Sequence, residues 1–149
     1  MHWTCNCGEV RLQVTQGDGA RILCHCSAFR DFAERFGSGD TLEPAGGGDL
    51  FQTAPETKQI TKGRDHLAWI KLTPKGPHRW HTTRCNTPMA NTLETRAIPF
   101  ATVLSHSIDD KEALGAIIAR VNRKYAIGHF DGEAGNTGRV IRSFLWRAL

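Results

Sequence analysis

The chain has 149 residues, 40% of them hydrophobic, and a formal net charge of +4. This is enough for one ordinary hydrophobic core, so we expect a single domain over residues 1–149 that depends on neither disulfides nor metal to fold. The sequence shows no secretory signal and no apolar run of about eighteen residues, so we expect a cytoplasmic protein with no membrane partner.

The first elements are a strand, a turn and a short helix. Polar and apolar residues alternate from Glu9 to Val14, which predicts a half-buried strand. Turn residues at 16–19 separate it from the run at 21–26, so the two runs are expected to form a hairpin. Ser27 is suited to cap a helix that ends near Gly37 and buries one face, formed by Phe29, Phe32, Ala33 and Phe36.

The middle of the chain is predicted to be mostly β. Residues 37–48 are dense in Gly, Pro and Asp and indicate a loop. Short strand-like runs separated by turn residues follow at 49–53, 58–63, 66–72 and 78–83. We therefore expect a mainly β fold of antiparallel sheets.

Two helices are predicted in a C-terminal extension, about residues 109–149. The first begins at Asp109 or Asp110 and has one apolar face, formed by Leu114, Ile117, Ile118, Val121 and Tyr125. A glycine-rich loop at 131–138 precedes the second, an amphipathic run at 139–149.

Four of the five cysteines form two C-x-C pairs, Cys5 with Cys7 and Cys24 with Cys26. In an extended or knuckle-like backbone, side chains two residues apart project to the same side. Zn–S bonds of about 2.3 Å place neighbouring sulfurs roughly 3.8 Å apart, which such a pair can match. Each pair could therefore supply half of a zinc site, and the alternative for each is a pair of buried cysteines without metal.

Three stretches carry a family resemblance: "CNCGEVRLQV" at 5–14, "CHCSAFRDFAERFG" at 24–37 and "RWHTTRCNTPMAN" at 79–91. In this order they resemble the glutathione-dependent formaldehyde-activating enzyme and centromere protein V (GFA/CENP-V) domain family. Its pattern is a C-x-C-G strand start, a C-x-C-x-x-C stretch entering a short helix, and a C-x-x-C-G-T-P turn. The resemblance covers residues 3–95. It implies an Mss4-like β-tent with a structural zinc site and a second, open zinc site associated with glutathione adducts of formaldehyde.

The resemblance assigns Cys5, Cys7 and Cys85 to the structural zinc site. The fourth ligand position falls on Thr82, and threonine is a poor zinc ligand. The adjacent His81 is our candidate for the fourth ligand, because three cysteines and one histidine are a common structural set. His2 is a second candidate, and loss of this zinc altogether is the remaining alternative.

Cys24 and Cys26 match the first two ligands of the open site, and Phe29 stands at the third position. Two sulfurs hold a zinc ion poorly, because an open site usually keeps three protein ligands. We expect this second site to be without zinc, and the space between the two thiols and the helix to be apolar and closed. His25 is expected to point the other way and to be hydrogen-bonded at the surface.

These features favour a divergent GFA-like zinc-binding protein with a degenerate catalytic site, acting as a binding or structural module. The alternative is a carbon–sulfur lyase-like enzyme in which Cys24 or Cys26 acts on adducts of glutathione or other thiols with aldehydes. Nucleic-acid binding is a second alternative, disfavoured because a basic helix face is usually only solvated. It would use Trp146 and the basic residues Arg120, Arg123, Lys124, Arg139, Arg142 and Arg147. The ligand and the oligomeric state stay open.

Overall fold

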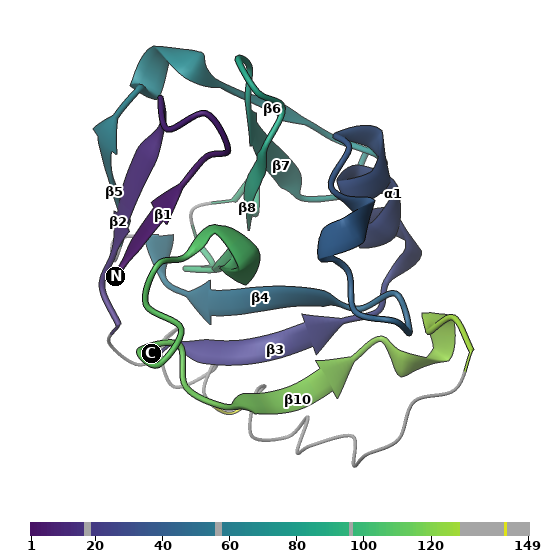
Figure 1. Ribbon diagram of the computed structural model, residues 1–149. Helices are drawn as coiled ribbons and strands as arrows, with labels where there is room; N and C mark the ends of the chain where they lie inside the picture. Colours follow the sequence, from purple (N-terminus) through teal and green to yellow (C-terminus); the bar gives the residue numbers. More distant parts are fainter. Residues whose placement is uncertain (17–18, 56–57, 96, 129–141, 143–149) are drawn as a thin grey trace.

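The computed structural model describes the chain except for residues 17–18, 56–57, 96, 129–141 and 143–149. Its strands form two sheets (Figure 1). The three-stranded sheet has the order β1 (His2–Thr4), β2 (Arg11–Val14) and β5 (Lys58–Lys62). The seven-stranded sheet has the order β10 (Ile117–Val121), β3 (Ala20–Cys24), β4 (Gly48–Thr53), β9 (Ala101–Leu104), β8 (Pro88–Thr92), β7 (His78–Thr82) and β6 (Leu67–Ile70).

Helical structure in the described residues is short. The α-helix α1 (Ser27–Arg35) follows β3. Four single 3-10 turns lie in connections, at η1 (Gly39–Thr41), η3 (Arg64–His66), η4 (Ser105–Ser107) and η5 (Arg123–Tyr125). The prediction of a mainly β protein is therefore confirmed. None of the helical segments that the structure describes has the length and hydropathy needed to cross a membrane.

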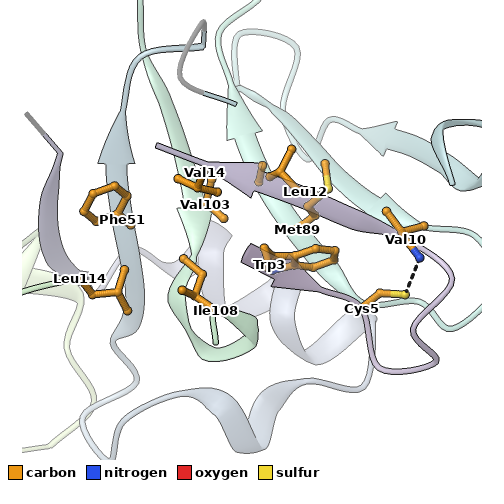
Figure 2. Packing of buried hydrophobic residues seen from close by; sticks show 11 residues of the cluster. Trp3, Cys5, Val10, Leu12, Val14, Phe51, Met89, Val103, Ile108 and Leu114 are labelled. Atoms are coloured by element: carbon orange, nitrogen blue, oxygen red, sulfur yellow. Dashed lines mark hydrogen bonds between the residues drawn. The ribbon is translucent and has the colours of Figure 1, made fainter. Parts of the chain in front are cut away.

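The main hydrophobic core lies between the two sheets (Figure 2). Because side chains alternate along a strand, Leu12 and Val14 of β2 share one face. They pack with Trp3 of β1 against Phe51 of β4 and Val103 of β9. Trp3 and Val103 have no exposed surface. The adjacent residues Leu50 on β4 and Leu104 on β9 point to the opposite face of the large sheet. There they belong to a second hydrophobic cluster.

Helix α1 confirms the helix predicted after Cys26. Its N-cap is Cys26, one residue earlier than expected. Gly37 has a φ of +68°, which favours glycine. The Gly37 and Ser38 amides donate to the carbonyls of Glu34 and Ala33, at 3.0 and 2.8 Å, and this is the Schellman pattern of helix ends. The residues buried on its inner face are Phe29, Phe32 and Ala33.

The strand-like runs predicted in the middle of the chain are confirmed as β4, β5, β6 and β7. The Gly-rich segment 37–48 is a connection that contains η1 before β4 begins. The predicted hairpin between 9–14 and 21–26 is wrong, because β2 pairs with β1 and β5 whereas β3 pairs with β4 and β10. Local pattern predicted both strands, but their partners come from distant parts of the chain.

The helix predicted from Asp109 or Asp110 to Tyr125 is also wrong. Residues 117–121 form β10, which lies parallel to β3 at the edge of the large sheet (Figure 1). Gly115, with a φ of +70°, turns the chain before the strand. The β-branched Ile117, Ile118 and Val121 are also favoured in strands, and burial of Ala119 against the sheet decides between the two patterns. The second predicted helix, at 139–149, lies outside the described residues except for Arg142.

Candidate metal centre and ligand pocket

Three thiols meet where two turns from different sheets approach each other. Cys5 and Cys7 lie between β1 and β2, and Cys85 lies between β7 and β8. Their sulfur atoms all lie within 4.8 Å of one another, and the Cys5 and Cys7 sulfurs are 3.6 Å apart. Tetrahedral Zn–S geometry requires roughly 3.8 Å. This cluster could hold a metal ion.

The two turns are joined by hydrogen bonds of the Thr87 side chain. Its hydroxyl accepts the backbone N–H of Asn6 at 3.1 Å and lies 3.0 Å from the sulfur of Cys85. Asn86 has a φ of +52° in the turn that follows Cys85. Asparagine is one of the few residues other than glycine that enter this left-handed region readily, so the residue suits the turn.

The Thr82 side chain lies beside Cys85, one of the three thiols. Its hydroxyl lies 3.2 Å from the Cys85 sulfur and accepts the backbone N–H of Thr87 at 3.0 Å. Although burial alone would raise it, the pKa of the Cys85 thiol is lowered to about 6, because the Thr82 and Thr87 hydroxyls hydrogen-bond to its sulfur. The sulfur of Cys5 likewise accepts the backbone N–H of Val10 at 3.2 Å (Figure 2). The contacts at Cys85 favour its thiolate form, which is the form that binds metals.

Neither candidate histidine lies with the three thiols. His81 follows Arg79 by two residues on β7, and its ring stacks on Phe36 at 4.1 Å between centroids. Burial lowers the pKa of His81. His2 lies in β1 with its ring 3.4 Å from the Asp109 carboxylate. The structure thus brings Cys5, Cys7 and Cys85 together and leaves both imidazoles elsewhere.

The second pair, Cys24 and Cys26, lies on the opposite side of the large sheet, where β3 leads into α1. The two sulfurs are 3.3 Å apart. The side-chain amide of Asn122 donates to the Cys24 sulfur at 3.4 Å. The hydrogen bond with Cys26 lowers the pKa of Cys24 to about 6, helped by Asn122 and by the charge of Arg79, and the same bond raises the pKa of Cys26.

The ring of Phe29 lies beside the two thiols, at the position where the resemblance predicts a third ligand. Phe29 is 2% exposed and lies directly over Gly48, the β4 residue that pairs with Cys24. A Cβ atom at Gly48 would lie only 1.8 Å from the Phe29 ring. Glycine at this position is what allows α1 to place a phenyl ring next to the two thiols.

The space beside these thiols is not closed, contrary to expectation. A pocket of about 440 Å³ opens there, and Cys26 is partly exposed. Most of its wall is apolar and comes from Ile22, Phe29, Leu50, Pro77, Phe100 and Val121. The prediction of an apolar space is therefore right about its lining and wrong about its closure.

A row of polar side chains crosses the floor of this pocket. Gln52, Thr102, Asn91 and Arg79 stand opposite one another in the register of β4, β9, β8 and β7. The Arg79 guanidinium donates to the Asn91 Oδ1 at 3.1 Å, and the Asn91 amide donates to the Thr102 hydroxyl at 2.9 Å. All four residues are at most 5% exposed.

Arg79 carries a buried positive charge at the end of this row. Its guanidinium lies 5.7 Å from the centre of the Phe32 ring. Burial lowers the pKa of Arg79, whereas the nearby Cys26 and Cys24 oppose this shift. The charge therefore favours a thiolate in the pair of sulfurs.

His25 points away from the pocket, as expected, but it is completely buried rather than at the surface. Its Nδ1 lies 3.3 Å from the Ala45 carbonyl and 3.5 Å from the Glu43 carboxylate. Its Nε2 lies 3.3 Å from the guanidinium of Arg120, which is itself 3.4 Å from Glu43. This network fixes the segment between the two thiols to the 43–47 loop and to β10.

Sequence reasoning did not identify the polar residues of the pocket. Arg79, Asn91, Thr102 and Asn122 come from four separate segments, so no local motif joins them. One signal was available. Arg79 and Trp80 are consecutive residues of a predicted strand, so their side chains point to opposite faces, and the face of Arg79 could also be buried. The large sheet's second buried face became evident only from the fold.

Comparisons with known proteins extend the description of the fold. No curated protein matches the chain. A crystal structure of a Rhodobacter sphaeroides protein, a structural genomics target, matches with a TM-score of 0.50 and 19% identity. The match covers 78% of this chain and 97% of that one, and at this identity it concerns the fold alone. The model of DUF6151, a family of unknown function, matches residues 1–149, and the protein therefore belongs to the DUF6151 family.

Proposed function

We propose that this protein is a divergent GFA/CENP-V-like domain with an Mss4-like tent, which holds one zinc ion and binds a small molecule in its pocket. The contrast between its two cysteine sites carries the proposal. On one side of the large sheet, three thiols lie within 4.8 Å of one another. On the other side, two thiols adjoin a phenyl ring and a pocket.

Zinc suits the Cys5, Cys7 and Cys85 cluster because its donors are all sulfur. Soft thiolates select zinc over hard cations such as magnesium or calcium. The 3.6 Å between the Cys5 and Cys7 sulfurs is near the required spacing. Three sulfurs leave one position of a tetrahedral zinc ion for water or another small ligand.

The pocket beside Cys24 and Cys26 suits an organic ligand better than a metal. Small-molecule sites are typically apolar clefts of about 300–1,000 Å³ with a few polar groups that orient the ligand. The pocket of about 440 Å³ has that character, with Arg79, Asn91 and Thr102 as its polar groups. Because Phe29 stands where the resemblance expects a third thiol, binding does not depend on a second zinc ion.

The alternative function is a carbon–sulfur lyase-like activity on adducts of glutathione or other thiols with aldehydes. The observation in its favour is that Cys24, whose thiolate form is stabilised by its neighbours, lines the pocket. This alternative requires turnover of the glutathione–formaldehyde adduct, and a second zinc ion in the family manner.

Zinc content per chain separates these functions. We expect one zinc ion in the wild type, none in Cys85→Ser, and one in the matched variant Cys24→Ser, because only Cys85 belongs to the three-thiol cluster. Elemental analysis of purified protein provides the measurement. A wild type without zinc contradicts the proposed metal site. Two zinc ions together with turnover of the adduct would favour the lyase.

A further inference from the structure

The Cys24 and Cys26 pair has features that a pair of buried structural cysteines does not require. Its sulfurs are in hydrogen-bond contact at 3.3 Å. An S–S bond is about 2 Å long, so bond formation requires each sulfur to move by well under an ångström. The two residues lie at the junction between β3 and α1.

The two sulfurs differ in their hydrogen-bond partners, in the charge near them and in their exposure. Asn122 directs its side-chain amide to Cys24 at 3.4 Å. Asn122 has a φ of +57°, a left-handed conformation that asparagine adopts more readily than most residues other than glycine. The nearby charge of Arg79 adds to the effect of this amide. Cys26 is the more exposed of the two and caps α1.

We propose that Cys24 and Cys26 form a redox-active dithiol that reduces small organic disulfides bound in the pocket. The proposal rests on the proposed function in one respect, because it needs these two thiols to be free of metal. Cys24 is the attacking thiol and Cys26 the resolving thiol.

The reaction is thiol–disulfide exchange in two steps. The Cys24 thiolate attacks one sulfur of the substrate RSSR, the S–S bond breaks, and RS⁻ leaves and takes up a proton. Cys26 then gives up its proton to solvent, and its sulfur attacks Cys24 and displaces the second RS⁻, which is protonated in turn. Two electrons pass from the dithiol to the substrate, and the products are two RSH molecules and a Cys24–Cys26 disulfide.

The pocket determines the class of disulfide. Its wall beside the thiols is largely apolar, which favours a substrate with an apolar or aromatic body. The polar row ending at Arg79 can accept one polar or anionic group. We therefore expect an aromatic disulfide to react faster than glutathione disulfide, which is larger and carries several charges.

The test uses the full-length zinc-loaded protein with 4,4′-dithiodipyridine, followed by mass spectrometry. In the wild type we expect a Cys24–Cys26 disulfide that a dithiol reductant reverses, with zinc retained. Cys26→Ser should stop at a thiopyridyl adduct on Cys24. Cys24→Ser should react at Cys26 at least about tenfold more slowly, because its thiol lacks the groups that favour the thiolate.

Asn122→Asp is the matched variant for the attacking thiol. Aspartate has nearly the same size and also tolerates the left-handed conformation, but it places a negative charge near the Cys24 sulfur. We expect slower formation of the adduct with unchanged zinc content. Far-ultraviolet circular dichroism of each variant checks that the fold is retained.

The outcomes distinguish the two proposals. If folded wild-type protein keeps one zinc ion and forms no Cys24–Cys26 disulfide, or accumulates the Cys24 adduct without resolution, the dithiol proposal is wrong and the proposed function stands. If two zinc ions are present and the reagent releases one while Cys24 and Cys26 react, both are wrong. If no zinc is bound but the disulfide forms reversibly, only the metal site is wrong.

Discussion

Phe29 is the residue on which the character of the second cysteine site depends. Its ring adjoins Cys24 and covers Gly48, and it stands where the proposed resemblance would place a third thiol. A phenyl ring supplies burial but no ligand atom. Phe29 therefore packs α1 on the sheet and offers no donor to the site.

Phe29→Cys restores the third thiol and tests this exchange. We expect zinc content to rise from one ion to two per chain, and the free energy of unfolding of the zinc-free protein to fall by about 3 kcal/mol, because a large buried ring is lost. Elemental analysis and urea unfolding in the presence of a chelator measure the two effects. Phe29→Leu is the control, since it also removes ring volume but offers no sulfur. Equal zinc in both variants would show that residue 29 does not decide metal binding.

At the level of elements, the contact between α1 and β4 sets the shape of the pocket. Helix α1 can approach β4 closely because Gly48 has no side chain, and the Phe29 ring uses that space. On the other side of β3, His25 and Arg120 join the thiol-bearing segment to β10. The pocket lies where α1, β4 and β10 are held together in this way, and its lining also comes from β3, β7, β8 and β9.

Gly48→Ala should displace α1. The new methyl group would lie 1.8 Å from the Phe29 ring, so the ring or the strand must move. We expect a loss of about 1–3 kcal/mol in the free energy of unfolding, as for other overpacked cores, and a change in the reactivity of Cys24. Urea denaturation measures the first effect. Gly39→Ala is the control, because its nearest new contact would be an ordinary 3.5 Å. Equal stability of the two variants would argue against this packing.

Over the whole molecule, the three-thiol cluster links the two sheets at one end of the main core. Cys5 and Cys7 belong to a turn of the small sheet and Cys85 to a turn of the large sheet. Cys5 also forms part of the hydrophobic core beside Trp3 and Val10 (Figure 2). A metal ion here would cross-link segments about eighty residues apart, and such a cross-link adds its binding free energy to folding.

Removal of zinc should therefore lower the melting temperature of the whole protein. A bound metal that contributes a few kcal/mol is expected to shift Tm by on the order of 5–10 °C in a chain of this size. Differential scanning calorimetry with and without a strong chelator measures the shift. Cys85→Ser should melt at the same temperature in both conditions, since it has no complete cluster to lose. If the chelator does not change the Tm of the wild type, no metal stabilises the fold.

Local sequence pattern was sufficient for features whose physical cause is local. The alternation in residues 9–14, the helical spacing of Phe29 and Phe32, and Gly37 at the helix end each predicted an element that the structure contains. The pairing of cysteines two residues apart likewise indicated two candidate sites, since side chains at that spacing can point to the same side. Cys5 and Cys7 meet this condition in a turn rather than in a strand. These predictions needed no knowledge of distant segments.

The tertiary structure decided everything that depends on distant partners. Residues 117–121 have a spacing that suits a helix and β-branched residues that suit a strand, and the open edge of β3 settled the choice. Thr82 and His81 are neighbours in sequence, yet Thr82 contacts the Cys85 sulfur whereas the His81 ring packs on Phe36. The pocket needed four strands in register before Arg79 and Thr102 could share its floor. The sequence pattern of a segment indicates its periodicity. Long-range packing decides which other segment it pairs with, and this pairing sets the burial and the chemical surroundings of its side chains.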